Sequence, residues 1–198
     1  MSKKLVYKQE SFTQDPQAKE FLVDGQPYTV DELIRSMLID DNEAASTILY
    51  ENVEQASLDE VYSDLGVNIK EDKFNDDYIS VKQFALFFRV LYNATYLNRQ
   101  FSEKALSLLS ETNPANGIGL GLQNDLTLAH RYRIRSFTDN GQTLLENHAC
   151  GIIYYPQHPY IVCLMSVAKD KANIDNLFHD INLAAYNYTN ELYQSHNY

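Results

Sequence analysis

Apolar residues recur three and four positions apart through the first half of the chain, which is the spacing of amphipathic helices. The first such run follows Thr29, which can cap a helix with Glu32 as its capping-box partner. Residues 1–27 lack this spacing and are predicted to form an extended, loop-rich lead-in. Four more helices are predicted, beginning after the polar break at 40–42, at Ser57 (ending before Gly66), after Ser80 and at Ser102.

The second half of the chain changes to the composition of β-strands. Three segments near 126–135, 147–155 and 160–167 carry the β-branched and aromatic residues that strands favour, and the last two predict a hairpin around Pro156–Pro159. Gly117, Gly119 and Gly121 predict a flexible crossing into this sheet, and the apolar spacing over 174–192 predicts a closing amphipathic helix. Helices, then an antiparallel sheet, then a covering helix indicate an α+β fold.

The bulk properties narrow the classes of function. A chain of 198 residues is long enough for one well-cored domain. Its net charge of −11 argues against a nucleic-acid partner, because such binding draws on clustered Lys and Arg. We expect no membrane span, since no apolar run is long enough, and the first ten residues lack the apolar core of a signal peptide.

Cysteine and histidine usage predicts neither a metal site nor a cofactor. Cys150 and Cys163 flank the predicted hairpin turn and can lie near each other, but two cysteines alone do not establish a disulfide. Because free cysteine is commonly buried, two buried thiols are the favoured interpretation. The five histidines and two cysteines show no ligand spacing.

Two motifs carry a resemblance to a known family. Asp40-Asp41-Asn42 precedes a helix that opens with small residues, and Arg131-Tyr132-Arg133 precedes the strand at 147–155. Together they resemble the second and third signature segments of the serine β-lactamase and penicillin-binding-protein superfamily. The resemblance implies one β-lactamase-like domain over 1–198, with a helical lobe over 28–121 and the sheet and last helix over 122–198. It also implies that the domain is N-terminally incomplete, because the family's Ser-x-x-Lys helix is expected upstream.

The resemblance assigns roles to individual residues. Asn42 matches the asparagine that holds the substrate's acyl chain, and Arg131 keeps the positive charge that binds a substrate carboxylate. Asp40 stands where the family has a serine that relays a proton, and an ionised carboxylate only accepts hydrogen bonds. Arg133 stands where the family has glycine; with Arg131 it is expected on one strand face, where a guanidinium obstructs the substrate. Tyr132, between them, belongs to the same predicted substrate-binding motif.

Two further matches are weaker. Glu71, in a stretch predicted to be a polar loop, opens a segment resembling the Glu-x-x-Leu-Asn of class A β-lactamases, where glutamate activates water; a solvated loop charge is the alternative and the favoured interpretation. The one literal Ser-x-x-Lys, Ser166 to Lys169, is expected to be a coincidence, because Ser166 falls at the end of a predicted strand rather than at a helix start.

Three hypotheses for function remain open. The first is a catalytically inactive relative that acts as a binding or scaffold module for a β-lactam or a peptidoglycan-peptide-like ligand. The second is a fragment of an active serine hydrolase whose nucleophile lies upstream, and the third is an unrelated α+β protein. The resemblance also implies an extracytoplasmic location in the cell envelope. An uncovered sheet edge predicts self-association.

Overall fold

The computed structural model describes residues 3–8, 22–67, 70–71, 77–123 and 125–194. The chain divides into two compact units, Met1–Ile79 and Ser80–Tyr198, and each is described by itself. In the described ranges, no helix is both long enough and apolar enough to cross a membrane.

In its described residues, the first unit contains three helices and two small sheets. Strand β1 pairs antiparallel with β2, and β3 pairs antiparallel with β4. The elements are β1 (Lys4–Val6), β2 (Pro27–Thr29), α1 (Val30–Ile39), α2 (Glu43–Glu51), α3 (Gln55–Leu65), β3 (Lys70–Glu71) and β4 (Asp77–Tyr78). The predicted lead-in thus contains a strand, β1, and the stretch predicted as a loop after Lys70 contains two short strands.

Helix α1 starts where the sequence predicts. The Thr29 hydroxyl accepts a hydrogen bond from the Glu32 backbone N–H at 3.2 Å, and the Glu32 carboxylate accepts one from the Thr29 N–H at 2.7 Å. This reciprocal capping box satisfies two of the donors that a helix start leaves unpaired. These hydrogen bonds from Thr29 lower the pKa of Glu32.

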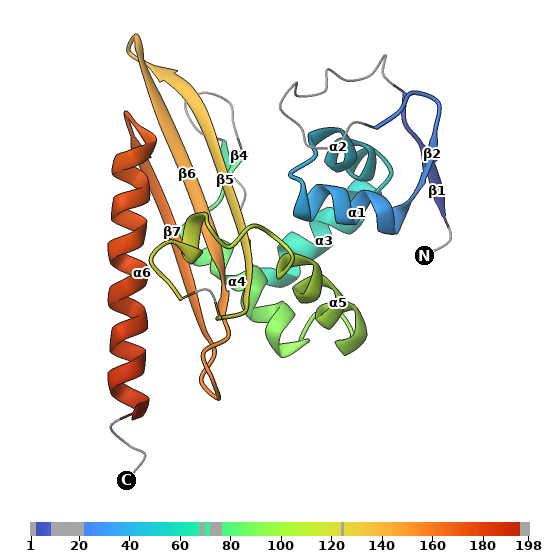
Figure 1. The fold of residues 1–198 in the computed structure, drawn as a ribbon. Helices are drawn as coiled ribbons and strands as arrows, with labels where there is room; N and C mark the ends of the chain where they lie inside the picture. The colour runs from blue at the N-terminus through green and yellow to red at the C-terminus, as the bar shows by residue number, and fades with distance from the viewer. Residues whose placement is uncertain (1–2, 9–21, 68–69, 72–76, 124, 195–198) are drawn as a thin grey trace. The chain divides into compact units, whose positions relative to one another are not determined.

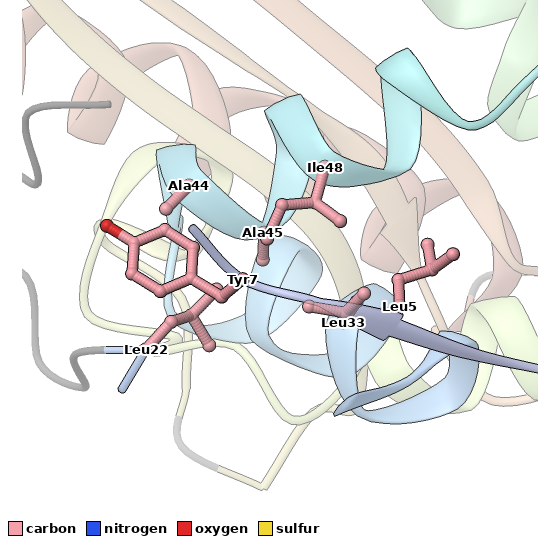
Figure 2. Packing of buried hydrophobic residues seen from close by; sticks show 7 residues of the cluster. All are labelled: Leu5, Tyr7, Leu22, Leu33, Ala44, Ala45 and Ile48. Atoms are coloured by element: carbon pink, nitrogen blue, oxygen red, sulfur yellow. The ribbon is translucent and has the colours of Figure 1, made fainter. Parts of the chain in front are cut away.

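The core of the first unit lies between β1 and helices α1 and α2. Leu33 of α1 and Ala45 of α2 are fully buried. Figure 2 shows the Tyr7 ring beside Leu22 and Ala44, whose small side chain leaves room for the ring. The core therefore depends on the small residues with which α2 opens.

The second unit is a three-stranded antiparallel sheet in the order β5-β6-β7 with helices packed on it. Helix α6 runs along the sheet in Figure 1, and α4 contacts β6 and β7. Its elements are α4 (Val81–Asn93), α5 (Arg99–Leu109), the short 3-10 helix η2 (Gly117–Gly119), β5 (Leu128–Asp139), β6 (Gln142–Ile153), β7 (Tyr160–Ala168) and α6 (Lys171–Gln194). The predicted α+β class, with three core strands and a long C-terminal helix, is confirmed.

In the second unit, one helix begins where the sequence predicts and another begins earlier than predicted. Ser80 caps α4 through a capping box with Gln83, as expected. The predicted start of the next helix at Ser102 is wrong: Asn98 caps α5, accepting from the Phe101 N–H at 2.9 Å, and Ser102 is buried inside the helix.

The segment predicted to be a flexible crossing is a close-packed turn. A Cβ added to Gly117 would lie 2.9 Å from side-chain atoms of both Tyr132 and Ala149, so only glycine fits. The buried Asn182 of α6 donates from Nδ2 to the carbonyls of Gly117 at 3.0 Å and Leu120 at 3.1 Å. The glycines therefore allow close approach rather than flexibility.

Candidate functional site

The turn between α1 and α2 carries the first predicted motif. Asp40 is the C-cap of α1, and its N–H donates to the Ser36 carbonyl at 3.1 Å. Asp41 is exposed and has a left-handed φ of 55°. Asn42 is 3% exposed and caps α2, with its Oδ1 accepting from the Ala45 N–H at 3.0 Å.

This geometry limits what the turn can do chemically. The Asn42 Oδ1 is engaged by the helix start and the side chain is buried, so the structure shows Asn42 as the cap of α2. Asp40 contributes a carboxylate to this turn, and an ionised carboxylate only accepts hydrogen bonds.

The second motif lies on β5 of the other unit. Tyr132 packs in the cluster that contains Ile174 and Phe178 of α6. Because side chains alternate along a strand, Arg131 and Arg133 project from the opposite face. The prediction that these two arginines share a face agrees with the strand geometry, and Arg133 is exposed while Arg131 is half-buried. Tyr132 does not share their surface.

A carboxylate and a histidine lie beside this arginine face. Glu146 of β6 pairs with Arg135 across the ladder, with its Oε2 2.5 Å from the Arg135 Nε. The other oxygen lies 2.8 Å from the Nε2 of His148, which is the cross-strand partner of Arg133. Burial alone would raise the pKa of Glu146, but the hydrogen bonds from Arg135 and His148 outweigh it and hold the pKa below its usual value.

The face toward α6 holds a separate polar group. Burial raises the pKa of the Tyr132 phenol, with opposing effects from Lys171 and Asp175 nearby. Lys171 is hydrogen-bonded to Asp175 one helical turn on. The neighbouring Asn147 is fully buried. These contacts assign Tyr132 to the packing of α6.

His130 precedes the motif and is the most enclosed histidine that the structure describes. It is 1% exposed, and neither ring nitrogen has a hydrogen-bond partner within the described residues. Burial lowers its pKa to about 4; the nearby Asn113 backbone acts against this, and the charge of Arg131 adds to it. At neutral pH the ring is therefore uncharged.

The comparison with protein families identifies the family of this chain. The model of the β-lactamase enzyme family (Beta-lactamase2) matches residues 1–189. The chain belongs to this family. No curated protein sequence matches it.

Solved structures of the family share the fold at low sequence identity. PBP-A is 16% identical with a TM-score of 0.75, covering 96% of this chain and 72% of its own. The TLA-3 extended-spectrum β-lactamase is 17% identical with a TM-score of 0.77, covering 94% and 75%. A β-lactamase from Chitinophaga pinensis is 16% identical with a TM-score of 0.71, covering 90% and 75%. At these identities the likeness shows the fold.

Other predicted residues of this family member fall elsewhere. Glu71 lies in β3, but its side chain and the rest of its motif, 72–75, are outside the described residues. Ser166 lies on β7 and Lys169 follows the strand's end, so the Ser-x-x-Lys pair is not on a helix, as expected. In the described ranges, no group of His, Cys, Asp and Glu could hold a metal ion.

Two features of the sheet were missed or mispredicted from the sequence. The contacts of Arg135, Glu146 and His148 were not predicted, although the alternation Arg131-x-Arg133-x-Arg135 is visible in the chain. The expectation of two free thiols is wrong in the structure: Cys150 and Cys163 are direct cross-strand partners and are joined as a disulfide.

A shallow hollow elsewhere in the second unit contains none of the predicted residues. It lies between α5 and the ends of the strands, with a volume of about 370 Å³. Its lining residues are Glu103, Leu106, Ser107, Ser110, Thr127 and Tyr154.

Proposed function

We propose that this chain is a catalytically inactive member of the β-lactamase family that binds a carboxylate-bearing ligand without acylating it. The observation that carries the proposal is the exposed guanidinium of Arg133 on the same strand face as Arg131. A site for acyl transfer needs the substrate backbone to approach this strand closely, which a glycine permits. An arginine at that position fills the space and adds a charge.

The other family positions support loss of chemistry more than loss of binding. Asp40 lacks the proton that a serine would pass to a leaving nitrogen, and Ser166 has no lysine one helical turn away to take its proton. Arg131 keeps a charge for a carboxylate, and its planar fork can bind both oxygens. Removing a nucleophile costs orders of magnitude in rate, whereas binding can survive.

The proposed ligand is a β-lactam or a peptidoglycan-peptide-like molecule with a free carboxylate. A structure of a PBP-A mutant is an acyl-enzyme complex with penicillin G, so that relative forms a covalent adduct. We propose that this chain forms only a reversible complex, in which Arg131 binds the carboxylate.

Covalent labelling with a fluorescent penicillin tests the absence of catalysis. The native protein should carry no label on a denaturing gel at any incubation time. The heat-denatured protein and Ser166→Ala are the controls. The proposal would be refuted if the native protein is labelled and protein heat-denatured before the incubation is not. If S166A also fails to become labelled, Ser166 is the nucleophile.

A second variant tests the steric role of Arg133. Arg133→Gly should increase the affinity for a β-lactam such as benzylpenicillin in equilibrium dialysis, because it removes the obstructing side chain. Arg99→Gly on α5 is the control for loss of one surface charge. An R133G protein that binds no β-lactam more tightly than the parent would show that Arg133 does not obstruct the site.

A second candidate is a fragment of an active hydrolase that works with a nucleophile encoded upstream. It is favoured by the solved relatives, of whose own length this chain covers 72–75% in the three cases given above. Extending the protein upstream and repeating the labelling separates the two candidates. Only a fragment should gain covalent labelling in the extended form.

We also propose self-association through β7. Among the described strands, β7 has β6 as its one neighbour, and its nine residues, Tyr160–Ala168, contain no charged side chain. An apolar edge strand without charges or proline is open to pairing with another chain. Sedimentation velocity should show a concentration-dependent dimer that Ile161→Lys weakens and Leu177→Lys on α6 leaves intact. A monomer at all concentrations would contradict the proposal.

A further inference from the structure

Three arginines form a row on one face of β5. Arg131, Arg133 and Arg135 are half of the six arginines in the chain, yet they fall within five residues. The chain as a whole carries a net charge of −11. This cluster of cations therefore forms a local site that attracts anions in an otherwise acidic protein.

The strand fixes the spacing of the row. Residues i and i+2 of a strand lie on the same face, about 6.8 Å apart along it. Twelve consecutive pairs join β5 to β6, without a bulge, from Leu128 to Asp139, so the alternation is regular across the whole row. The cations thus repeat at a fixed interval of about 6.8 Å.

The surroundings of the row are unequal along its length. At one end Arg135, whose side chain is 37% exposed, is paired with Glu146. In the middle the cross-strand partner of Arg133 is His148. Beyond Arg135 the same face continues with Phe137 and Asp139.

These guanidiniums can hold protein neighbours and a ligand together. Each carries five N–H donors in a planar fork, of which one carboxylate uses at most two or three. Arg135 can therefore keep Glu146 and still donate to another anion. The exposed Arg133 is the central contact point of the row.

We propose that the arginine row, Arg131, Arg133 and Arg135, binds an extended acidic peptide whose carboxylates alternate with neutral residues. In such a peptide every second side chain projects from the same face at about 6.8 Å, so its carboxylates match the row one for one. A peptide with adjacent acidic residues projects them to opposite faces and meets fewer arginines. The proposal deepens the proposed function, because it shares Arg131, but it needs no β-lactam binding.

Two peptides of equal composition test the spacing. Acetyl-Glu-Ala-Glu-Ala-Glu-amide and acetyl-Glu-Glu-Glu-Ala-Ala-amide carry the same charge, and isothermal titration calorimetry at low ionic strength measures both on the full chain. We expect the alternating peptide to bind roughly 5-fold more tightly, since each additional exposed ion pair contributes a factor of a few. Raising the salt concentration should weaken both complexes.

Matched variants test the residues. Arg133→Gln should remove the preference for the alternating peptide, and R99Q, which removes a charge from α5 at a side chain that is 86% exposed, should leave it unchanged. Equal affinity of the two peptides, no binding of either, or the same loss in R99Q as in R133Q would each overturn the proposal.

The outcomes also separate this inference from the proposed function. Covalent labelling by penicillin together with a preference for the alternating peptide would refute the inactive assignment and keep the arginine row. Absence of labelling together with equal affinity for the two peptides would keep the inactive assignment and reject the row.

Discussion

His130 makes the stability of the protein depend on pH in a way that one substitution can isolate. The side chain is 1% exposed, and burial lowers its pKa to about 4, against about 6.5 in an unfolded chain. Between these two values the unfolded chain binds a proton that the folded chain does not. The free energy of unfolding therefore rises with pH across this window.

The magnitude follows from the two pKa values. The contribution is fully present above about pH 6.5 and is lost as the pH falls toward 4. With a folded pKa of about 4, the loss is about 2 kcal/mol at pH 5 and about 3 kcal/mol at pH 4, relative to pH 7.5. The free energy of unfolding of a typical domain is roughly 5–15 kcal/mol, so a loss of this size is a large share of it.

His130→Leu removes the titrating group while keeping an apolar side chain of similar size. The ring nitrogens have no partner of good hydrogen-bond geometry in the described part of the chain, so the substitution gives up only the weaker interaction with the Asn113 backbone. Urea unfolding of both proteins at pH 7.5, 6, 5 and 4 gives the difference in unfolding free energy at each pH. This difference should shift in favour of H130L by about 3 kcal/mol on going from pH 7.5 to pH 4.

An exposed histidine provides the control. His179 on α6 has a side chain that is 49% exposed, and His179→Gln is the control for the loss of a histidine at a site that is not buried. Other groups titrate in all three proteins and cancel in the differences. A difference between parent and H130L that is constant with pH would show that His130 titrates normally, and the reasoning from burial would fail.

Three further predictions concern the packing of the second unit. Asn182→Ala removes the side-chain donor of two backbone carbonyls, of which that of Gly117 keeps the Leu120 N–H at 3.4 Å, and should lower the unfolding free energy by about 1–3 kcal/mol in urea; no change would show that water replaces the amide without cost. Gly151→Ala places a Cβ 2.5 Å from the neighbouring strand and should cost about 1–3 kcal/mol by the same measurement, and an unchanged midpoint would contradict the close packing. Cys150 and Cys163 should give no reaction with a thiol reagent in denaturant and two thiols after reduction, and reaction before reduction would contradict the disulfide.

Local signals predicted the fold where a few neighbouring residues decide the structure. The capping boxes at Thr29 and Ser80 mark helix starts because the cap and its partner are three residues apart. Ser102 misled because a serine inside a helix looks the same in sequence as a serine at its start. What decides there is burial against the rest of the unit, which depends on tertiary structure.

The candidate site was predictable to the extent that it depends on alternation along one strand. Arg131 and Arg133 were expected on one face, and the strand geometry agrees. The pairing of Arg135 with Glu146 depends instead on the register between β5 and β6. That register is set by the two-residue turn at Asn140 and Gly141, both with positive φ, a hairpin signal that was overlooked.

On the proposed function, the same register explains how an arginine face persists where acyl transfer is lost. Acyl transfer requires a nucleophile and its base within hydrogen-bonding distance, so one substitution can abolish it. Binding an anion requires only that positive charges stay at fixed intervals, and a regular ladder of strand pairs maintains these intervals whichever cation occupies each position. On our two proposals, Arg133 therefore obstructs acyl transfer and supplies one more cation for an acidic peptide.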